Sequence, residues 1–239
     1  PELIGGAGDL APPTNKRLQS NGAVEYAADN SAGRNVHFGI REHAMGAVLN
    51  GLSLAKCRPY GSGFLIFSDY GRAPIRLAAI MEIPVIYIFT HDSIGVGEDG
   101  PTHQPVEQLA SLRAIPGLLT IRPGDSNDVV EGGRVIMQLR HEPSVLILTR
   151  QALPTLDRTK YAAASGLAKG AYVLADAGGT PDVLLLATGS EVIDARGDRT
   201  VVGDLLDGAT RDLGDQPGAG GRAMLIVDHL QLVTALREA

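Results

Sequence analysis

Short apolar runs alternate with stretches of helical periodicity between residues 36 and 150. Three continuous β-branched and aliphatic runs have the pattern of strands buried on both faces of a sheet, namely 84–90, 118–123 and 144–149. Apolar residues at helical spacing predict helices at 42–54, 74–81 and 125–140. Strand, helix and strand at this spacing indicate an α/β fold with a parallel sheet flanked by helices.

Two local signals refine these elements. The segment Arg58–Gly61 contains Pro and Gly and predicts a break after the first helix, and Phe64–Phe67 is a short element that leads into the second. Asp125 or Ser126 is the expected cap of the third helix.

The rest of the chain predicts a second, incomplete α/β unit. Residues 182–191 have the pattern of a strand, a Gly turn and a helix start, and 225–227 is another strand candidate. We expect one α/β unit at 1–155, a linker at 156–181 that contains a small strand at 171–174, and a truncated or degenerate domain at 182–239. Residues 194–221 are expected to be the least ordered, because they have little apolar surface to offset their ordering entropy.

Composition narrows the class of protein. The 239 residues are 44% hydrophobic, enough for a sizeable core, and the net charge of −6 argues against a nucleic-acid or anionic-membrane surface. The single cysteine, Cys57, cannot form an internal disulfide, and no run is long enough for a membrane span or has the pattern of a signal peptide. These features predict a cytoplasmic protein, and the abrupt, strand-like start at Pro1 suggests a fragment.

A long polar loop follows the strand at 84–90. Residues 90–105 combine glycines with two imidazoles and three carboxylates. The imidazoles are His91 and His103, and the carboxylates are Asp92, Glu98 and Asp99. Loops of this length are usually functional or disordered, and ligands bind at the carboxyl ends of strands in parallel sheets. The spacing fits no known zinc or calcium pattern, so a polyhydroxylated substrate is the favoured ligand and no metal site is expected.

Other candidates have both a structural and a functional interpretation. Glu42 lies at a helix start, where its charge favours the helix amino terminus, and Phe64, Phe67 and Tyr70 have the spacing of core residues. A carboxyl group near such an aromatic platform would, however, have its ionised form disfavoured by desolvation, as suits a proton donor. Arg150, after a strand, is either a surface residue or an anion clamp.

Several motifs closely resemble those of transketolase. The longest is the loop at 90–105, which reads THDSIGVGEDGPTHQP. The others are Gly5-Gly6-x-x-Asp9-Leu10 and the segments 38–46, 58–61, 64–70, 148–154 and 187–192. The resemblance covers about residues 1–192, and related families that use the same cofactor do not carry the loop in this form.

This resemblance implies thiamine diphosphate as the cofactor, bound between the pyrimidine domain of one subunit and the diphosphate domain of another. Glu42 matches the glutamate that hydrogen-bonds the aminopyrimidine ring and promotes removal of the thiazolium proton. The aromatic pocket around the pyrimidine corresponds to Phe64, Phe67 and Tyr70, and Asp9 matches an aspartate near the cofactor.

The same resemblance implies a substrate site for sugar phosphates. His91 and Arg150 match phosphate-binding residues, and Asp99 and His103 match residues that contact the sugar hydroxyls. Glu42 and His103 are thus the candidate catalytic residues. The implied reaction is transfer of a two-carbon ketol unit between sugar phosphates, as in the pentose phosphate pathway. The implied partner is a second transketolase subunit, as in a homodimer, or a chain with the diphosphate domain, which would bind Mg²⁺ or Ca²⁺. No nucleic-acid or membrane partner is expected.

The match has gaps. The phosphate-contacting serine of the family is absent, with Thr14 as a possible substitute, and similarity ends near Val192. The Gly-Asp-Gly diphosphate domain is missing from these residues, so the chain is expected to be inactive in isolation. An alternative is a non-catalytic remnant or binding module that keeps the pyrimidine-domain fold.

Overall fold

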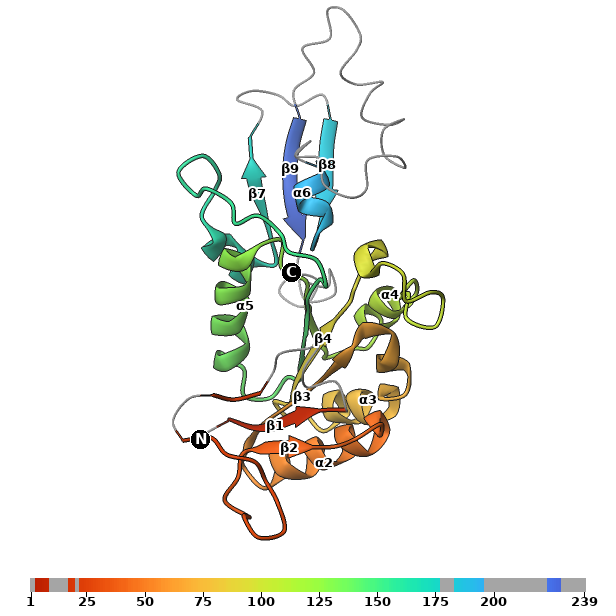
Figure 1. The fold of residues 1–239 in the computed structure, drawn as a ribbon. Helices are drawn as coiled ribbons and strands as arrows, with labels where there is room; N and C mark the ends of the chain where they lie inside the picture. Colours follow the sequence, from red (N-terminus) through yellow and green to blue (C-terminus); the bar gives the residue numbers. More distant parts are fainter. Residues whose placement is uncertain (1–2, 9–16, 20–21, 177–182, 196–222, 229–239) are drawn as a thin grey trace, which may run out of the picture. The chain divides into compact units, whose positions relative to one another are not determined.

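The computed structural model describes residues 3–8, 17–19, 22–176, 183–195 and 223–228. It divides into two compact units (Figure 1). The first comprises the described parts of 1–121 together with 136–150, and the second comprises 122–135 and the described parts of 151–230. The expected domain boundaries at 155 and 182 stay a prediction.

The first unit is built on a six-stranded sheet in which every pair of neighbouring strands is parallel. The strand order is β2-β1-β3-β4-β6-β5. The strands are β1 (Leu3–Ala7), β2 (Asn35–His37), β3 (Arg58–Phe64), β4 (Ile86–Thr90), β5 (Leu119–Ile121) and β6 (Ser144–Ile147). The predicted α/β fold with a parallel sheet flanked by helices is therefore confirmed.

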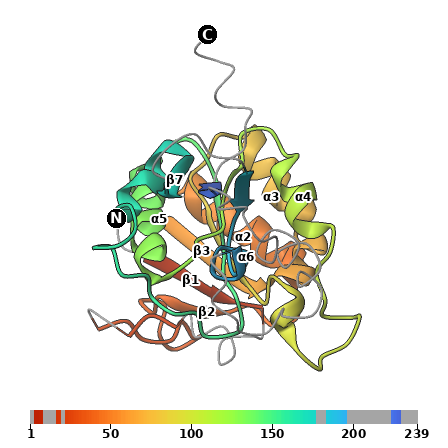
Figure 2. The same ribbon diagram turned by 90° about the horizontal axis from the view of Figure 1, so that it is seen from above.

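Three helices pack on this sheet through one apolar core. They are α2 (Glu42–Leu54), α3 (Arg72–Ile80) and α4 (Gln108–Arg113), and a 3₁₀ turn, η1 (Leu65–Asp69), precedes α3. The core joins Leu49 of α2, Ile75 of α3 and Leu112 of α4 to Tyr87 and Phe89 of β4. Helices α3 and α4 lie side by side (Figures 1 and 2), and Arg72 donates a hydrogen bond to Ser111 between them.

Helix α2 ends before 58–61, as expected, but this segment is itself part of a strand, β3, which was not predicted. All seven residues of Arg58–Phe64 are buried, although Pro59, Gly61 and Gly63 are weak strand formers. A Cβ on Gly61 would lie 2.5 Å from Leu49 Cδ1, so glycine there permits close approach of α2 to the sheet. Burial inside a parallel sheet, which only the tertiary structure provides, thus overrides local propensity.

The second unit contains a small mixed sheet in the order β7-β9-β8. Its strands are β7 (Ala171–Ala175), β8 (Val183–Ala187) and β9 (Ala223–Asp228). The pair β8–β9 is parallel, whereas β7, which lies within 156–181, pairs antiparallel with β9. The short helices η3 (Ala164–Lys169) and α6 (Glu191–Ala195) accompany this sheet. Of the segment 194–221, expected to be the least ordered, residues 194–195 belong to α6 and the rest lie outside the described residues.

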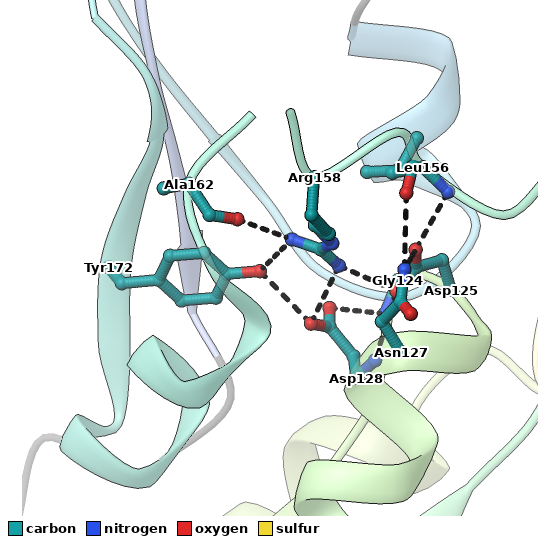
Figure 3. Close-up of polar contacts among 8 residues, drawn as sticks. All are labelled: Gly124, Asp125, Asn127, Asp128, Leu156, Arg158, Ala162 and Tyr172. Carbon is teal, nitrogen blue, oxygen red and sulfur yellow. Dashed lines mark hydrogen bonds and ion pairs between the residues drawn. The ribbon is translucent and has the colours of Figure 1, made fainter. Parts of the chain in front are cut away.

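A buried charged network joins helix α5 (Ser126–Gln138) to the loop after residue 150 (Figure 3). Asp125 caps the helix by accepting a hydrogen bond from the backbone N–H of Asp128 at 2.9 Å, which decides between the two expected caps. Arg158 Nη2 lies 2.7 Å from Asp125 Oδ1 and 3.1 Å from Asp128 Oδ1, and the Tyr172 hydroxyl donates to Asp128 Oδ1 at 3.0 Å.

The ionisation of these groups follows from their surroundings. Burial, and secondarily the nearby Asp128 carboxylate, raise the pKa of Tyr172 despite the opposing Arg158. Burial lowers the pKa of Arg158, but its bonds to Tyr172, Asp125 and Asp128 outweigh that effect and leave the pKa raised. The network therefore consists of one cation held by two carboxylates and a neutral phenol.

None of the helices that the structure describes has the length and apolar character that a membrane span requires.

Candidate functional site

The candidate site residues gather where parallel strands end. In the sheet register Ala7 lies beside Ser62 and Phe64 beside Thr90, so β1, β3 and β4 finish at one edge. Strand β6 is the neighbour of β4 in the sheet, and Arg150 is the third residue after its end. Side chains from the segments after these strands share the carboxyl edge of the sheet, where open α/β folds bind ligands.

Glu42 is the first residue of α2, and its side chain is buried, with 8% of the residue exposed. A Cβ on Gly8, just after β1, would lie 3.6 Å from Glu42 Oε1, and one on Gly71 would lie 3.7 Å from the Glu42 carbonyl oxygen. Gly8 thus lies beside the side chain of Glu42, and Gly71 lies beside its backbone. Among the described residues, no hydrogen bond or ion pair reaches its carboxylate, which is therefore available to a ligand.

The three aromatic residues form a stack that runs from the core to the surface. The ring centroids of Phe64 and Phe67 are 6.0 Å apart and those of Phe67 and Tyr70 are 6.1 Å apart, with both pairs stacked. Exposure rises from 7% at Phe64 to 65% at Tyr70. Gly71 follows Tyr70 directly, so the stack ends next to the first turn of α2 and offers a flat apolar surface near Glu42.

Both histidines of the loop contact this stack. The His91 ring lies over Phe64 with centroids 3.7 Å apart, and the His103 ring meets Phe67 edge-on at 5.4 Å. In each case the preceding threonine holds the ring, because Thr90 Oγ1 lies 2.8 Å from His91 Nδ1 and Thr102 Oγ1 lies 2.9 Å from His103 Nδ1. The Nε2 atoms are then the ring nitrogens left to face a ligand.

The backbone and charges around His91 indicate a specialised position. Its φ of +61° lies in the left-handed region, which costs energy for a residue with a side chain and is commonly kept at functional sites. Burial and the Arg150 charge lower the pKa of His91, although Asp99 and Asp92 oppose this. The ring is consequently neutral near pH 7 and can donate a hydrogen bond without carrying a charge.

Arg150 is exposed and lies beside the same loop. A Cβ on Gly97 would lie 3.6 Å from Arg150 Nη1. Within the described part of the chain, no carboxylate pairs with this guanidinium and no carbonyl accepts from it. An unpaired, solvent-facing guanidinium next to a neutral imidazole suits an anionic group of a ligand.

The structure thus brings most of the predicted site residues together. Ring contacts join Phe64, Phe67, Tyr70, His91 and His103, and electrostatic interactions with His91 place Arg150 and Asp99 nearby. Glu42 lies at the same edge but touches none of the rings through an identified contact. Asp9 and Thr14 lie outside the described residues. Among the residues that the structure describes, no three His, Cys, Asp or Glu side chains are grouped as metal ligands would be.

Sequence reasoning missed the residues that hold these parts in place. Gln108 is fully buried and hydrogen-bonds Asp69, which lies between Phe67 and Tyr70. The sequence around this single polar residue does not indicate the contact, because its partner is 39 residues away. The Thr-His dipeptide that occurs twice in the loop is a visible signal for the threonine contacts.

The fold and site define an open parallel α/β domain with aromatic, imidazole and carboxylate groups at its carboxyl edge. Residues 1–155 match the family model of the transketolase pyrimidine-binding domain. The chain therefore belongs to the transketolase family, as its motifs predicted.

Individual relatives agree with this assignment. A transketolase of Halalkalibacterium halodurans is 55% identical over 193 residues, covering 80% of this chain and 29% of the relative. The structure of Leishmania mexicana transketolase matches 98% of this chain and 32% of its own with a TM-score of 0.82 and 38% identity. Pichia stipitis transketolase in complex with sedoheptulose 7-phosphate matches with a TM-score of 0.81 and 35% identity, over 98% of this chain and 32% of its own. The chain thus spans under one third of the length of these relatives.

Proposed function

We propose that this chain supplies the pyrimidine half of a thiamine-diphosphate site that transfers a two-carbon ketol group between sugar phosphates. The observation that carries the proposal is the buried carboxylate of Glu42, which has no partner among the described residues and lies at the helix start next to the aromatic stack. Membership of the transketolase family supports it.

The residues present fit an aminopyrimidine ring. Its flat face matches the stacked surface of Phe67 and Tyr70, and a ring nitrogen can share a proton with the carboxylate of Glu42. When bound, thiamine diphosphate supplies the electron sink that makes cleavage of a bond next to a carbonyl feasible. This chain's part is to bind the ring, shield it from water and hold a proton at Glu42.

The substrate would occupy the region of His91, Asp99, His103 and Arg150. Arg150 would bind a phosphate through charge-assisted hydrogen bonds, with the neutral His91 as a second donor. Asp99 and His103 would bind sugar hydroxyls, as a carboxylate and an imidazole both can. The sedoheptulose 7-phosphate complex of the Pichia stipitis protein supports a phosphorylated sugar as the ligand class.

The partner would be a region that binds the diphosphate and its Mg²⁺ or Ca²⁺. This chain covers 29% of the Halalkalibacterium halodurans relative, so most of a transketolase has no counterpart here. We propose that such a region lies outside these 239 residues, in the rest of the gene product or in a partner chain, and that the 239 residues alone are inactive.

A hybrid enzyme tests the proposal. Residues 1–155 would replace the matching segment of the Halalkalibacterium halodurans transketolase, and ketol transfer from a ketose phosphate to an aldose phosphate would be measured. We expect cofactor-dependent activity within about tenfold of the parent enzyme, because the segment keeps every described site residue. A folded hybrid that binds no cofactor and transfers no ketol group would instead support a non-catalytic module.

In this hybrid we expect Arg150→Ala to act mainly on KM. The contact to phosphate is made in the ground state and in the transition state alike, so KM for a ketose phosphate rises roughly tenfold to a hundredfold while kcat changes little. Steady-state kinetics with an unphosphorylated ketose provide the control, since that substrate never uses the guanidinium. An equal loss with both substrates would contradict the assignment.

A further inference from the structure

We propose that Gln108 is the positioning residue that holds the aromatic stack and the histidine loop in register, an inference that rests on the proposed function. Gln108 is the first residue of α4 and its side chain is fully buried. Its Nε2 donates to Asp69 Oδ2 at 2.8 Å, and its Oε1 accepts from the backbone N–H of Val106 at 2.9 Å. One amide therefore joins the end of η1 to the end of the loop.

The two partners demand opposite chemistry from this side chain. A carboxylate needs a donor and a backbone N–H needs an acceptor, and a carboxamide supplies both at one end. Leu or Met would leave the Val106 N–H and a carboxylate oxygen of Asp69 without this partner, and Glu would place a second carboxylate against Asp69. Gln is therefore the side chain that satisfies both partners from this buried position.

The two hydrogen bonds of Gln108, which we call the clamp, attach to the chain near site residues at both ends. Asp69 lies between Phe67 and Tyr70 in the chain, and Val106 lies three residues after His103. The edge-on contact of His103 with Phe67 at 5.4 Å spans the same two segments. Because Gln108 fixes how η1 and the loop lie against each other, it sets the distance between the stack proposed for the cofactor and the imidazole proposed for the substrate.

A second contact strengthens the same junction. Asp69 Oδ1 lies 3.7 Å from Arg72 Nη2, and Arg72 also donates to Ser111 of α4. Asp69 therefore receives Gln108 on one oxygen and Arg72 on the other. Asp69→Asn would keep an oxygen for Arg72 and would gain an N–H donor. Combined with Gln108→Glu, it would preserve the hydrogen bond between residues 69 and 108 with donor and acceptor exchanged.

The first experiment uses the full chain and needs no cofactor. NMR would follow the His103 ring protons, which the Phe67 and Phe64 ring currents displace from the positions of a free histidine, with His103→Asn providing the assignment. We expect Gln108→Glu to return these resonances toward free-histidine positions at pH 7. The double variant Asp69→Asn with Gln108→Glu restores them, since acceptor and donor are exchanged.

Gln138→Glu is the matched control, because the same substitution at the exposed last residue of α5 keeps the charge change but touches neither segment. Unchanged His103 resonances in Gln108→Glu would overturn the proposal. If Gln108→Glu fails to fold, the double variant decides: a native His103 spectrum supports the clamp, and a perturbed or unfolded one refutes it.

The second experiment uses the hybrid enzyme. We expect Gln108→Glu to raise KM for a ketose phosphate about tenfold with kcat reduced less, because substrate binding is misaligned while Glu42 is untouched, and the double variant to return KM to within about twofold. A loss of kcat alone, or no rescue, would contradict a positioning role. An inactive unmutated hybrid would refute the proposed function, while the His103 spectra would still decide the role of Gln108.

Discussion

Replacing Glu42 with Gln in the hybrid enzyme is expected to lower kcat by about 10² to 10⁴ without loss of fold. Glutamine has the size of glutamate and can still hydrogen-bond, but it cannot exchange a proton with a ring nitrogen, and proton transfer by a positioned group contributes about that factor. The burial of Glu42 also limits the access of water that could replace the carboxylate. Initial-rate kinetics at saturating cofactor measure the effect.

Glu82→Gln is the control for this prediction, since Glu82 is exposed and lies between α3 and β4, before the amino end of β4 and not at the carboxyl edge of the sheet. It should leave kcat unchanged. Circular dichroism of both variants would show that the fold is intact. Parent-like kcat in Glu42→Gln would mean that the resemblance to transketolases extends to the fold but not to the mechanism.

Replacing Arg158 with Met is expected to lower the free energy of unfolding of the second unit by about 3–5 kcal/mol. The substitution keeps an apolar stem but leaves the buried carboxylates of Asp125 and Asp128 without their cation, and removing one partner of a buried ion pair typically costs this much. Urea unfolding followed by circular dichroism, together with amide exchange in β7, measures the loss.

Arg134→Met on the same helix is the matched control. Arg134 pairs with Glu131 at 2.5 Å, but its side chain is 67% exposed, and such surface pairs contribute about 0–1 kcal/mol. We therefore expect the two variants to differ by at least about 2 kcal/mol. Similar losses in both would show that the buried network of Figure 3 does not hold this unit together.

The elements that could be predicted are those whose local pattern agrees with their burial. The continuous apolar run at 84–90 is β4, that at 144–149 is β6, and the periodic stretch after Asp125 is α5. Strand β3 could not be predicted, because Pro59 and its glycines oppose a strand locally and only the approach of α2 explains them. The antiparallel pairing of β7 with β9 could not be predicted either, because it joins residues fifty or more positions apart.

The candidate site shows the same division. The sequence by itself determined the family, because the loop at 90–105 and the segment around Glu42 are contiguous motifs whose residue types are dictated by chemistry. It also named the aromatic trio, since a spacing of three is visible along the chain. These features concern neighbours in sequence, where order and identity carry the information.

Only the tertiary structure decided which side chains hold the parts together. The bond from Gln108 to Asp69 spans 39 residues and that from Arg158 to Asp125 spans 33, and neither residue stands out in its own segment. The pKa of His91 likewise depends on burial and on Arg150, a residue from another strand end. Hydrogen bonds and charge interactions act through space within a few ångströms, so their partners are fixed by how the strands assemble and not by the residues beside them in the chain.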